Sequence, residues 1–255
     1  MLNNNDWRSF GELFEDYVYG NNTGVCIKTG INRVDDIMRI EESSLTVIAG
    51  AKETGKTTLA MQMALHMAKQ NLKVAFFTLK ETKMQAAEIA LANEIGVSVG
   101  DVENKIKSGS EFEAVERVAR LPLFLSTSVD ETLYDAKLDR VDVAFIDGFT
   151  ELTKDAEGND EISNMAIAVK EFAMKTGIPV VMTSDLPAIT KKYVPDLAYL
   201  GKYDELEYVS DSIILIGGEN PTSAFYVAKN REGEAGIWFN IVFDKEKQRF
   251  LEVEP

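Results

Sequence analysis

The sequence has 255 residues, and its 27 Lys and Arg against 42 Asp and Glu give a formal net charge of −15. With 45% hydrophobic and 27% charged residues, the composition is that of a globular protein rather than a disordered one. The negative charge argues against a protein that binds nucleic acid over its whole surface, because such proteins normally carry a basic face. The net charge does not exclude a local basic groove or pore.

Redox and targeting signals point to the cytoplasm. The single cysteine, Cys26, cannot form an internal disulfide, which favours a reducing compartment. The first ten residues lack the basic and apolar regions of a secretory signal. No apolar run approaches the roughly 20 residues that span a bilayer. We therefore expect a cytoplasmic chain with no membrane partner.

Residues 1–28 predict an amphipathic arm. Asp6 is a candidate helix N-cap, and Gly20 ends the helical pattern. The apolar side chains that recur at helical spacing between them are Trp7, Phe10, Leu13, Phe14 and Tyr17. Either this helix packs on its own domain, or it lays its aromatic stripe on a neighbouring subunit. Residues 29–255 form the second expected unit.

In this second unit, apolar strand patterns alternate with helical ones. The expected strands are 45–49, 74–77, 123–125, 141–146, 180–182 and 212–216, followed by an antiparallel pair, 224–228 and 236–243. The expected helices are 57–70, 84–95, two short ones within 99–119, and 162–176. This alternation indicates an α/β fold with a doubly wound, mainly parallel sheet and an antiparallel C-terminal edge.

A phosphate-binding loop lies between the first strand and the first long helix. It reads Gly50-Ala51-Lys52-Glu53-Thr54-Gly55-Lys56-Thr57 and matches GxxxxGK[ST] in full, with Thr58 continuing into the helix. The backbone N–H groups of such a loop and the positive end of the helix dipole bind phosphate. We expect Lys56 to reach the β- and γ-phosphate oxygens of ATP and the hydroxyl of Thr57 to ligate Mg²⁺.

Asp147 directly follows the apolar strand 141–146. A carboxylate at the carboxyl end of a buried parallel strand lies where such sheets bind ligands. We therefore expect Asp147 to help bind the nucleotide by positioning Mg²⁺ with Thr57. The alternative is a solvated turn residue before Gly148.

With these two sites placed, the chain from about Lys28 to Leu251 resembles the C-terminal RecA-like ATPase domain of the DnaB family of replicative helicases. Besides the P-loop and Asp147, the resemblance rests on Thr29-Gly30 with Asp35, on Gly177-Ile178-Pro179-Val180-Val181-Met182-Thr183-Ser184, and on Val227-Ala228-Lys229-Asn230-Arg231-Glu232-Gly233. It implies a RecA-like P-loop NTPase that uses ATP and Mg²⁺ in a homo-oligomer, usually a hexameric ring. The family's primase-contacting N-terminal domain is missing from the sequence, and the arm stands where the family has a linker helix.

By the same resemblance, Lys229 and Arg231 look like basic fingers that touch the γ-phosphate of a neighbouring subunit's ATP. An arginine in that place neutralises transition-state charge and couples hydrolysis to subunit contact. The alternative is two surface charges on a hairpin, because residues i and i+2 share one face of a strand in either case.

Three departures from the family pattern bear on activity. The family's catalytic glutamate position holds Lys80, so Glu81 becomes the candidate for polarising water. The sensor glutamine position holds Asp185, which cannot donate a hydrogen bond to phosphate while it is ionised. The expected channel loops, 154–161 and a segment within 187–205, are acidic and mixed in charge, which disfavours DNA phosphates.

Two functions follow from these features. The first is a DnaB-like ATPase that acts on DNA in replication as a translocase or helicase, with Lys56, Glu81, Lys229 and Arg231 as catalytic residues. Single-stranded DNA is then a weakly supported partner. The second is a regulator that binds nucleotide, hydrolyses it slowly or not at all, and assembles with another replication protein. A recombinase-like or clock-type ATPase is a remoter alternative.

Overall fold

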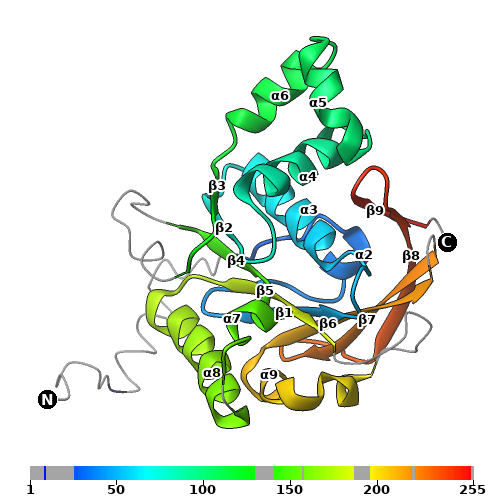
Figure 1. Ribbon diagram of the computed structural model, residues 1–255. Helices are drawn as coiled ribbons and strands as arrows, with labels where there is room; N and C mark the ends of the chain where they lie inside the picture. The colour runs from blue at the N-terminus through cyan, green and yellow to red at the C-terminus, as the bar shows by residue number, and fades with distance from the viewer. Residues whose placement is uncertain are drawn as a thin grey trace, which may run out of the picture.

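The computed structural model describes Ser9 and residues 26–129, 141–156, 158–186, 196–219 and 222–253. Nearly all of the predicted arm and part of the second predicted channel loop lie outside these ranges. The described chain forms a sheet of nine strands with helices on both faces (Figure 1).

Nine strands and nine helical segments make up the described chain. The strands are β1 (Leu45–Gly50), β2 (Val74–Thr78), β3 (Leu123–Ser126), β4 (Val143–Asp147), β5 (Val180–Asp185), β6 (Ser212–Glu219), β7 (Thr222–Asn230), β8 (Ile237–Asp244) and β9 (Arg249–Glu252). The helices are α2 (Asn32–Asp35), α3 (Lys56–Lys69), α4 (Lys83–Ile95), α5 (Val99–Lys107), α6 (Phe112–Ala119), α7 (Phe149–Leu152), α8 (Asn159–Thr176), α9 (Glu205–Val209) and a 3₁₀ helix, Leu197–Tyr203.

The strand order is β3-β2-β4-β5-β1-β6-β7-β8-β9. Pairing is parallel from β3 through β6 and antiparallel from β6 through β9. Because β1, β2 and β4 are buried along their whole length, they are continuously apolar rather than alternating. The predicted α/β fold, with a doubly wound parallel sheet and an antiparallel C-terminal edge, is confirmed.

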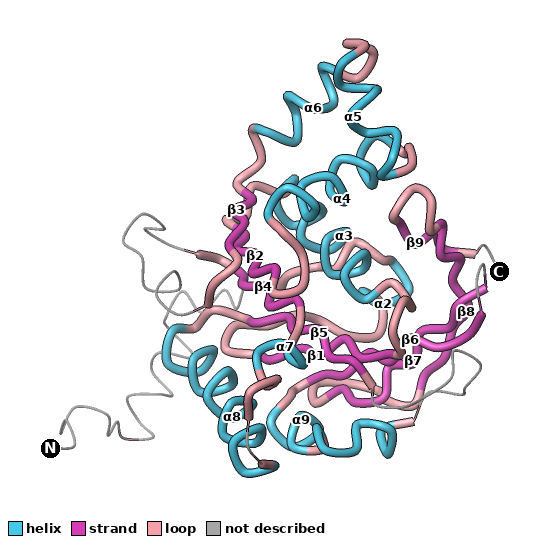
Figure 2. Tube along the Cα trace, viewed as in Figure 1, coloured by secondary structure: helices cyan, strands magenta, loops and turns pink. Residues whose placement is uncertain are grey.

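Two apolar cores lie on opposite faces of this sheet. Figure 1 shows α3 and α4 on one face and α7, α8 and α9 on the other, and Figure 2 shows the strands running between these layers. Side chains of β1 alternate between the cores: Ile48 belongs to the core that includes α3, and Leu45 and Val47 belong to the one that includes α8. The carboxyl ends of the central strands therefore lie between two packed helix layers. This packing holds in place the loops that follow these strands, including the P-loop.

Most predicted elements form, with boundaries shifted by a few residues. β4 begins at Val143 rather than 141, and the carboxylate of Asp142 accepts a hydrogen bond from the Lys73 amide at 2.8 Å. The stretch 197–209, part of which belongs to the segment expected to hold the second channel loop, forms the 3₁₀ helix and α9. The strand β9 was not predicted. Among the described residues, no helix is long and apolar enough to cross a membrane.

Candidate functional site

The P-loop connects the carboxyl end of β1 to α3, and its two glycines lie where a side chain would not fit. A Cβ on Gly50 would come within 2.7 Å of Thr54 Oγ1 and 2.9 Å of the Ile216 carbonyl oxygen. Gly55 has a φ of +93° and packs against the rings of Phe243 and Phe250. Glu53 also has a positive φ, 64°, although it is not glycine. Such backbone strain is commonly kept at functional loops.

Lys56 is folded into this loop. Its side chain is only 5% exposed, and its ammonium group donates to the carbonyl oxygens of Gly50 at 3.0 Å and Ala51 at 2.7 Å. The same nitrogen lies 2.7 Å from Asp185 Oδ1. The hydroxyl of Thr54 also donates to the Ala51 carbonyl, at 2.9 Å. The loop thus holds Lys56 with its charge directed toward the carboxyl end of β5.

Asp147 lies at the end of β4, fully buried, and accepts two hydroxyl groups. Thr57 donates to its two oxygens at 3.1 and 2.8 Å, and Thr183 donates to Oδ1 at 2.7 Å. Burial raises the pKa of Asp147, and the two hydroxyls only partly oppose this. Among the described residues, no lysine or arginine nitrogen forms an ion pair with it. A buried carboxylate beside a hydroxyl is a donor set that suits Mg²⁺, which prefers hard oxygen ligands.

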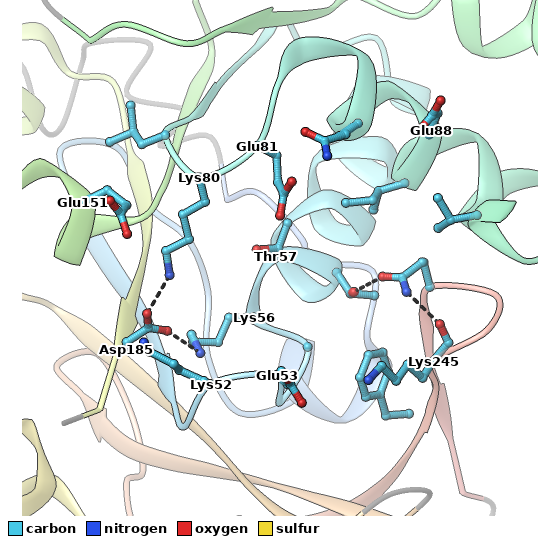
Figure 3. A pocket seen from close by; sticks show the side chains of 18 residues that line it. Lys52, Glu53, Lys56, Thr57, Lys80, Glu81, Glu88, Glu151, Asp185 and Lys245 are labelled. Carbon is cyan, nitrogen blue, oxygen red and sulfur yellow. Dashed lines mark hydrogen bonds and ion pairs between the residues drawn. The ribbon is translucent and has the colours of Figure 1, made fainter. Parts of the chain in front are cut away.

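A pocket of about 740 Å³ opens beside these groups. The predicted site residues that line it are Lys52, Glu53, Gly55, Lys56, Thr57, Thr58 and Glu81. In Figure 3, the carboxylate of Glu81 points into the pocket on the side of Thr57, whereas the ammonium of Lys80 points toward Asp185. Of the two residues Lys80 and Glu81, which follow β2 closely, it is thus Glu81 whose side chain faces the helix after the P-loop.

Asp185 bridges two lysines. Its Oδ1 lies 2.7 Å from Lys56 Nζ and its Oδ2 lies 2.8 Å from Lys80 Nζ, and Thr150 donates to Oδ2 at 3.4 Å. Burial opposes ionisation of this mostly buried carboxyl, but the two ammonium groups, Lys56 first, hold its pKa below the ordinary value. Asp185 is therefore a fixed negative charge beside the lysine of the P-loop.

Lys229 lies in β7 and Arg231 directly follows this strand, at the end of the sheet where β1 begins. The ammonium of Lys229 donates to the carbonyl oxygens of Glu207 and Ser210 at the end of α9. Arg231 is 67% exposed, and its guanidinium lies 3.2 Å from Asp211 Oδ1. Asp211 also accepts from the Leu45 amide at the start of β1. Because the P-loop follows the far end of β1, the structure does not bring these two residues to their own chain's pocket.

Several pocket residues were missed by sequence reasoning. Phe243, Lys245 and Gln248 enter from the β8–β9 hairpin, and Gln85, Glu88 and Ile89 enter from α4. The hairpin is tied to α3 because Thr58 donates to Gln248 at 2.6 Å and Gln62 pairs with the backbone of Phe250. No motif marks the hairpin positions, because their partners on α3 lie 188 and 190 residues away in the sequence.

Two segments that the sequence analysis singled out, the turn at Asp35 and the acidic segment 154–161, have local structural roles. Asp35 accepts from the amides of Thr29 and Gly30, at 2.6 and 3.1 Å, and so fixes the turn before α2. In the acidic segment 154–161, Asp160 and Glu161 occupy the first turn of α8, where the helix dipole favours negative charge. The acidity of this segment therefore has a structural cause in addition to any effect on DNA.

The comparisons with known proteins agree with this fold. A solved structure described as an ATPase domain superposes with a TM-score of 0.81 at 17% identity, covering 98% of this chain and 100% of that one. A DnaB-like replicative helicase, described together with its interactions with primase, gives 0.80 at 16%, covering 98% and 68%. Among curated protein sequences, none matches. The sequence model of the DnaB-like helicase C-terminal domain matches residues 26–252. The chain therefore belongs to the DnaB-like helicase C-terminal domain family, whose fold it shares.

Proposed function

We propose that this chain hydrolyses ATP with Mg²⁺ at a site shared between two copies of itself in a ring. The observation that carries the proposal is the separation of its parts. Lys56, Thr57, Glu81 and Asp147 gather at the carboxyl ends of the strands, whereas Arg231 lies at the amino ends, 67% exposed. A site that needs all of them is complete only when a second subunit brings its Arg231.

Each residue then has a role that its position supports. Lys56 binds the β- and γ-phosphate oxygens, and Thr57 with Asp147 holds Mg²⁺, which supplies charge neutralisation at the phosphates when it is bound. Glu81 orients the attacking water and accepts its proton. Arg231 of the neighbouring copy stabilises the charge that develops on the transferred phosphoryl group. Lys229 was expected to touch the same phosphate, but its ammonium donates to carbonyl oxygens at the end of α9, so in this proposal it holds the end of β7 that precedes Arg231 in position.

Membership of the DnaB-like family supports a role in DNA replication, with translocation along single-stranded DNA by a homo-oligomer, hexameric in our proposal. One similar structure is described with its interactions with primase, and a replication protein is a fitting partner here too. The acidic residues near the expected channel predict that DNA is held weakly, because phosphate contacts supply most non-specific affinity.

ATP turnover with and without single-stranded DNA tests this function. We expect turnover that rises with protein concentration as copies assemble, rises further with single-stranded DNA, and is lost in Lys56→Ala. Lys105→Ala, which removes an exposed lysine of α5 outside the pocket lining and outside the expected channel loops, is the matched control. Turnover that is insensitive to both DNA and assembly would contradict the proposal.

The alternative is a nucleotide-binding regulator. The observation that favours it is the ion pair between Asp185 and Lys56. A bound phosphate would have to compete with this carboxylate for the ammonium group of Lys56. A regulator would bind ATP and assemble in response to it, with turnover near background and equal in wild type and Glu81→Gln. The same turnover assay therefore distinguishes the two functions.

A further inference from the structure

The Lys80–Asp185 pair lies inside the candidate nucleotide pocket, and the family pattern explains neither residue. Lys80 Nζ is 2.8 Å from Asp185 Oδ2, across 105 positions of sequence. Both side chains are mostly buried, with exposed fractions of 21% and 17%. A pair this sheltered has a defined geometry, unlike an exposed surface pair that is worth little.

The stem of Lys80 is guided toward the pocket by the backbone after β4. A Cβ built on Gly148 would lie 3.2 Å from Lys80 Cγ and 3.3 Å from Cε, so the lysine stem runs directly over this glycine. Gly148 itself has a φ of +121°, which favours glycine. The charge at the end of the stem therefore arrives beside Asp185 and not in solvent, as Figure 3 shows.

A triphosphate entering the pocket must compete with Asp185. The carboxylate lies 2.7 Å from the ammonium of Lys56, the group on which the P-loop binds phosphate oxygens. A γ-phosphate at Lys56 would therefore stand beside a carboxylate of the same sign. The other ammonium in contact with that carboxylate belongs to Lys80. When a triphosphate is bound, Lys80 is attracted both to Asp185 and to the γ-phosphate.

The charges that line the pocket show why a second lysine near the phosphates matters for binding a polyanion. Four lysines line the pocket, Lys52, Lys56, Lys80 and Lys245, against five carboxylates, Glu53, Glu81, Glu88, Glu151 and Asp185. The lining is thus slightly negative, although its ligand would be a polyanion. Without Lys80, Asp185 would repel most strongly the phosphate that lies nearest to it, which in the proposed site is the γ-phosphate at Lys56.

From these contacts we propose that Lys80 is a second ligand of the γ-phosphate, acting within its own subunit, and that Asp185 holds it at the pocket until a nucleoside triphosphate arrives. Lys80 then determines the preference for triphosphate over diphosphate. This inference rests on the proposed nucleotide site and adds a residue to it. It also accounts for the joint presence of a lysine and an aspartate, because each compensates the charge of the other.

Nucleotide affinity tests the inference. Binding of a ribose-labelled, non-hydrolysable ATP analogue and of labelled ADP would be followed by fluorescence anisotropy on dilute protein with Mg²⁺. We expect Lys80→Gln to weaken binding of the ATP analogue about tenfold and of ADP by less than about threefold, since a hydrogen bond to a charged group is lost only with the triphosphate. Lys80→Arg keeps the charge and should retain most of the preference.

Two controls sharpen the result. Lys83→Gln removes an exposed lysine at the start of α4, three residues away, and should change neither affinity. In Lys80→Gln/Asp185→Asn the repelling carboxylate is also gone, so the ATP analogue should bind more tightly than it does to Lys80→Gln alone. Thermal unfolding of each variant checks that it is folded.

Equal loss of affinity for both nucleotides in Lys80→Gln, or loss for neither, would overturn the role of Lys80 while leaving the nucleotide site intact. Absence of binding by the wild type, or binding that survives Lys56→Ala unchanged, would instead overturn the proposed site and this inference with it. If the effects of Lys80→Gln and of Asp185→Asn, each measured alone, simply add up in the double variant, this would also count against the pair acting as a unit.

Discussion

Thr57 and Asp147 lie 90 residues apart in the sequence and meet where the P-loop becomes a helix, with the threonine hydroxyl 2.8 Å from one carboxylate oxygen and 3.1 Å from the other. The contact joins α3 to the end of β4. The carboxylate is fully buried, and burial raises its pKa. Its charge is therefore unfavourable in the nucleotide-free protein and becomes favourable beside a cation.

Replacing Asp147 with asparagine should stabilise the protein while abolishing turnover. Because the folded-state pKa of Asp147 is raised above its unfolded value, the stability it contributes is present at low pH and is lost as pH rises through the folded pKa. Asp147→Asn removes the buried charge, and we expect the free energy of unfolding at pH 7 to rise by about 1 kcal/mol. Urea denaturation without Mg²⁺ measures this, with the exposed Asp155→Asn as control. A decrease at pH 7 would contradict the assignment.

Asp211 should make the protein sensitive to acid. Burial opposes its ionisation, but Lys170 at 2.6 Å, the Leu45 amide at 2.8 Å and Arg231 together lower its pKa. A lowered folded-state pKa gives stability that is present above the unfolded value and is lost as pH falls through the folded one. We expect Asp211→Asn to cost about 2 kcal/mol at pH 7, because the mostly buried ammonium of Lys170 loses its carboxylate partner and keeps only its hydrogen bond to the Ser43 carbonyl.

The difference between wild type and Asp211→Asn should shrink as the pH falls from about 5 toward about 3, measured by denaturant unfolding at each pH. Lys175→Ala removes an exposed partner of Glu171 and should cost less than about 0.5 kcal/mol at every pH. A gap that stays constant across this range would show that ionisation of Asp211 is not its cause.

Glu81→Gln should separate binding from chemistry. Since a carboxylate that positions and deprotonates water contributes typically about 10²–10⁴-fold, turnover should fall by at least about a hundredfold while affinity for ATP stays within about threefold. Glu88→Gln alters another pocket carboxylate, on α4, and should reduce turnover much less. Comparable turnover in wild type and Glu81→Gln would remove Glu81 from the catalytic set.

The sequence predicts local and motif-based features well. Strands such as 141–146 are recognised because burial on both faces makes them nearly continuously apolar, and the P-loop is recognised because its chemistry fixes its spacing. Contacts between distant segments escape such reasoning. The β8–β9 hairpin that closes the pocket is joined to Thr58 and Gln62 across almost 190 residues.

The same limit applies to the departures from the family pattern. Taken singly, Lys80 and Asp185 each suggest an impaired site. Together they form one ion pair, because the parallel strands β2 and β5 both end at the pocket. Periodicity could predict these strands but not which of their terminal side chains meet, which depends on strand order.

The central claim is a catalytic site shared between subunits, and complementation tests it most directly. Arg231→Ala and Glu81→Gln should each abolish turnover alone. When the two variants are mixed and allowed to assemble, an interface that joins an intact pocket from one to an intact Arg231 from the other should restore a fraction of wild-type turnover. Arg120→Ala, an exposed arginine of the α6 end, should behave as wild type. Mixed assemblies with no more turnover than either variant alone would contradict the claim.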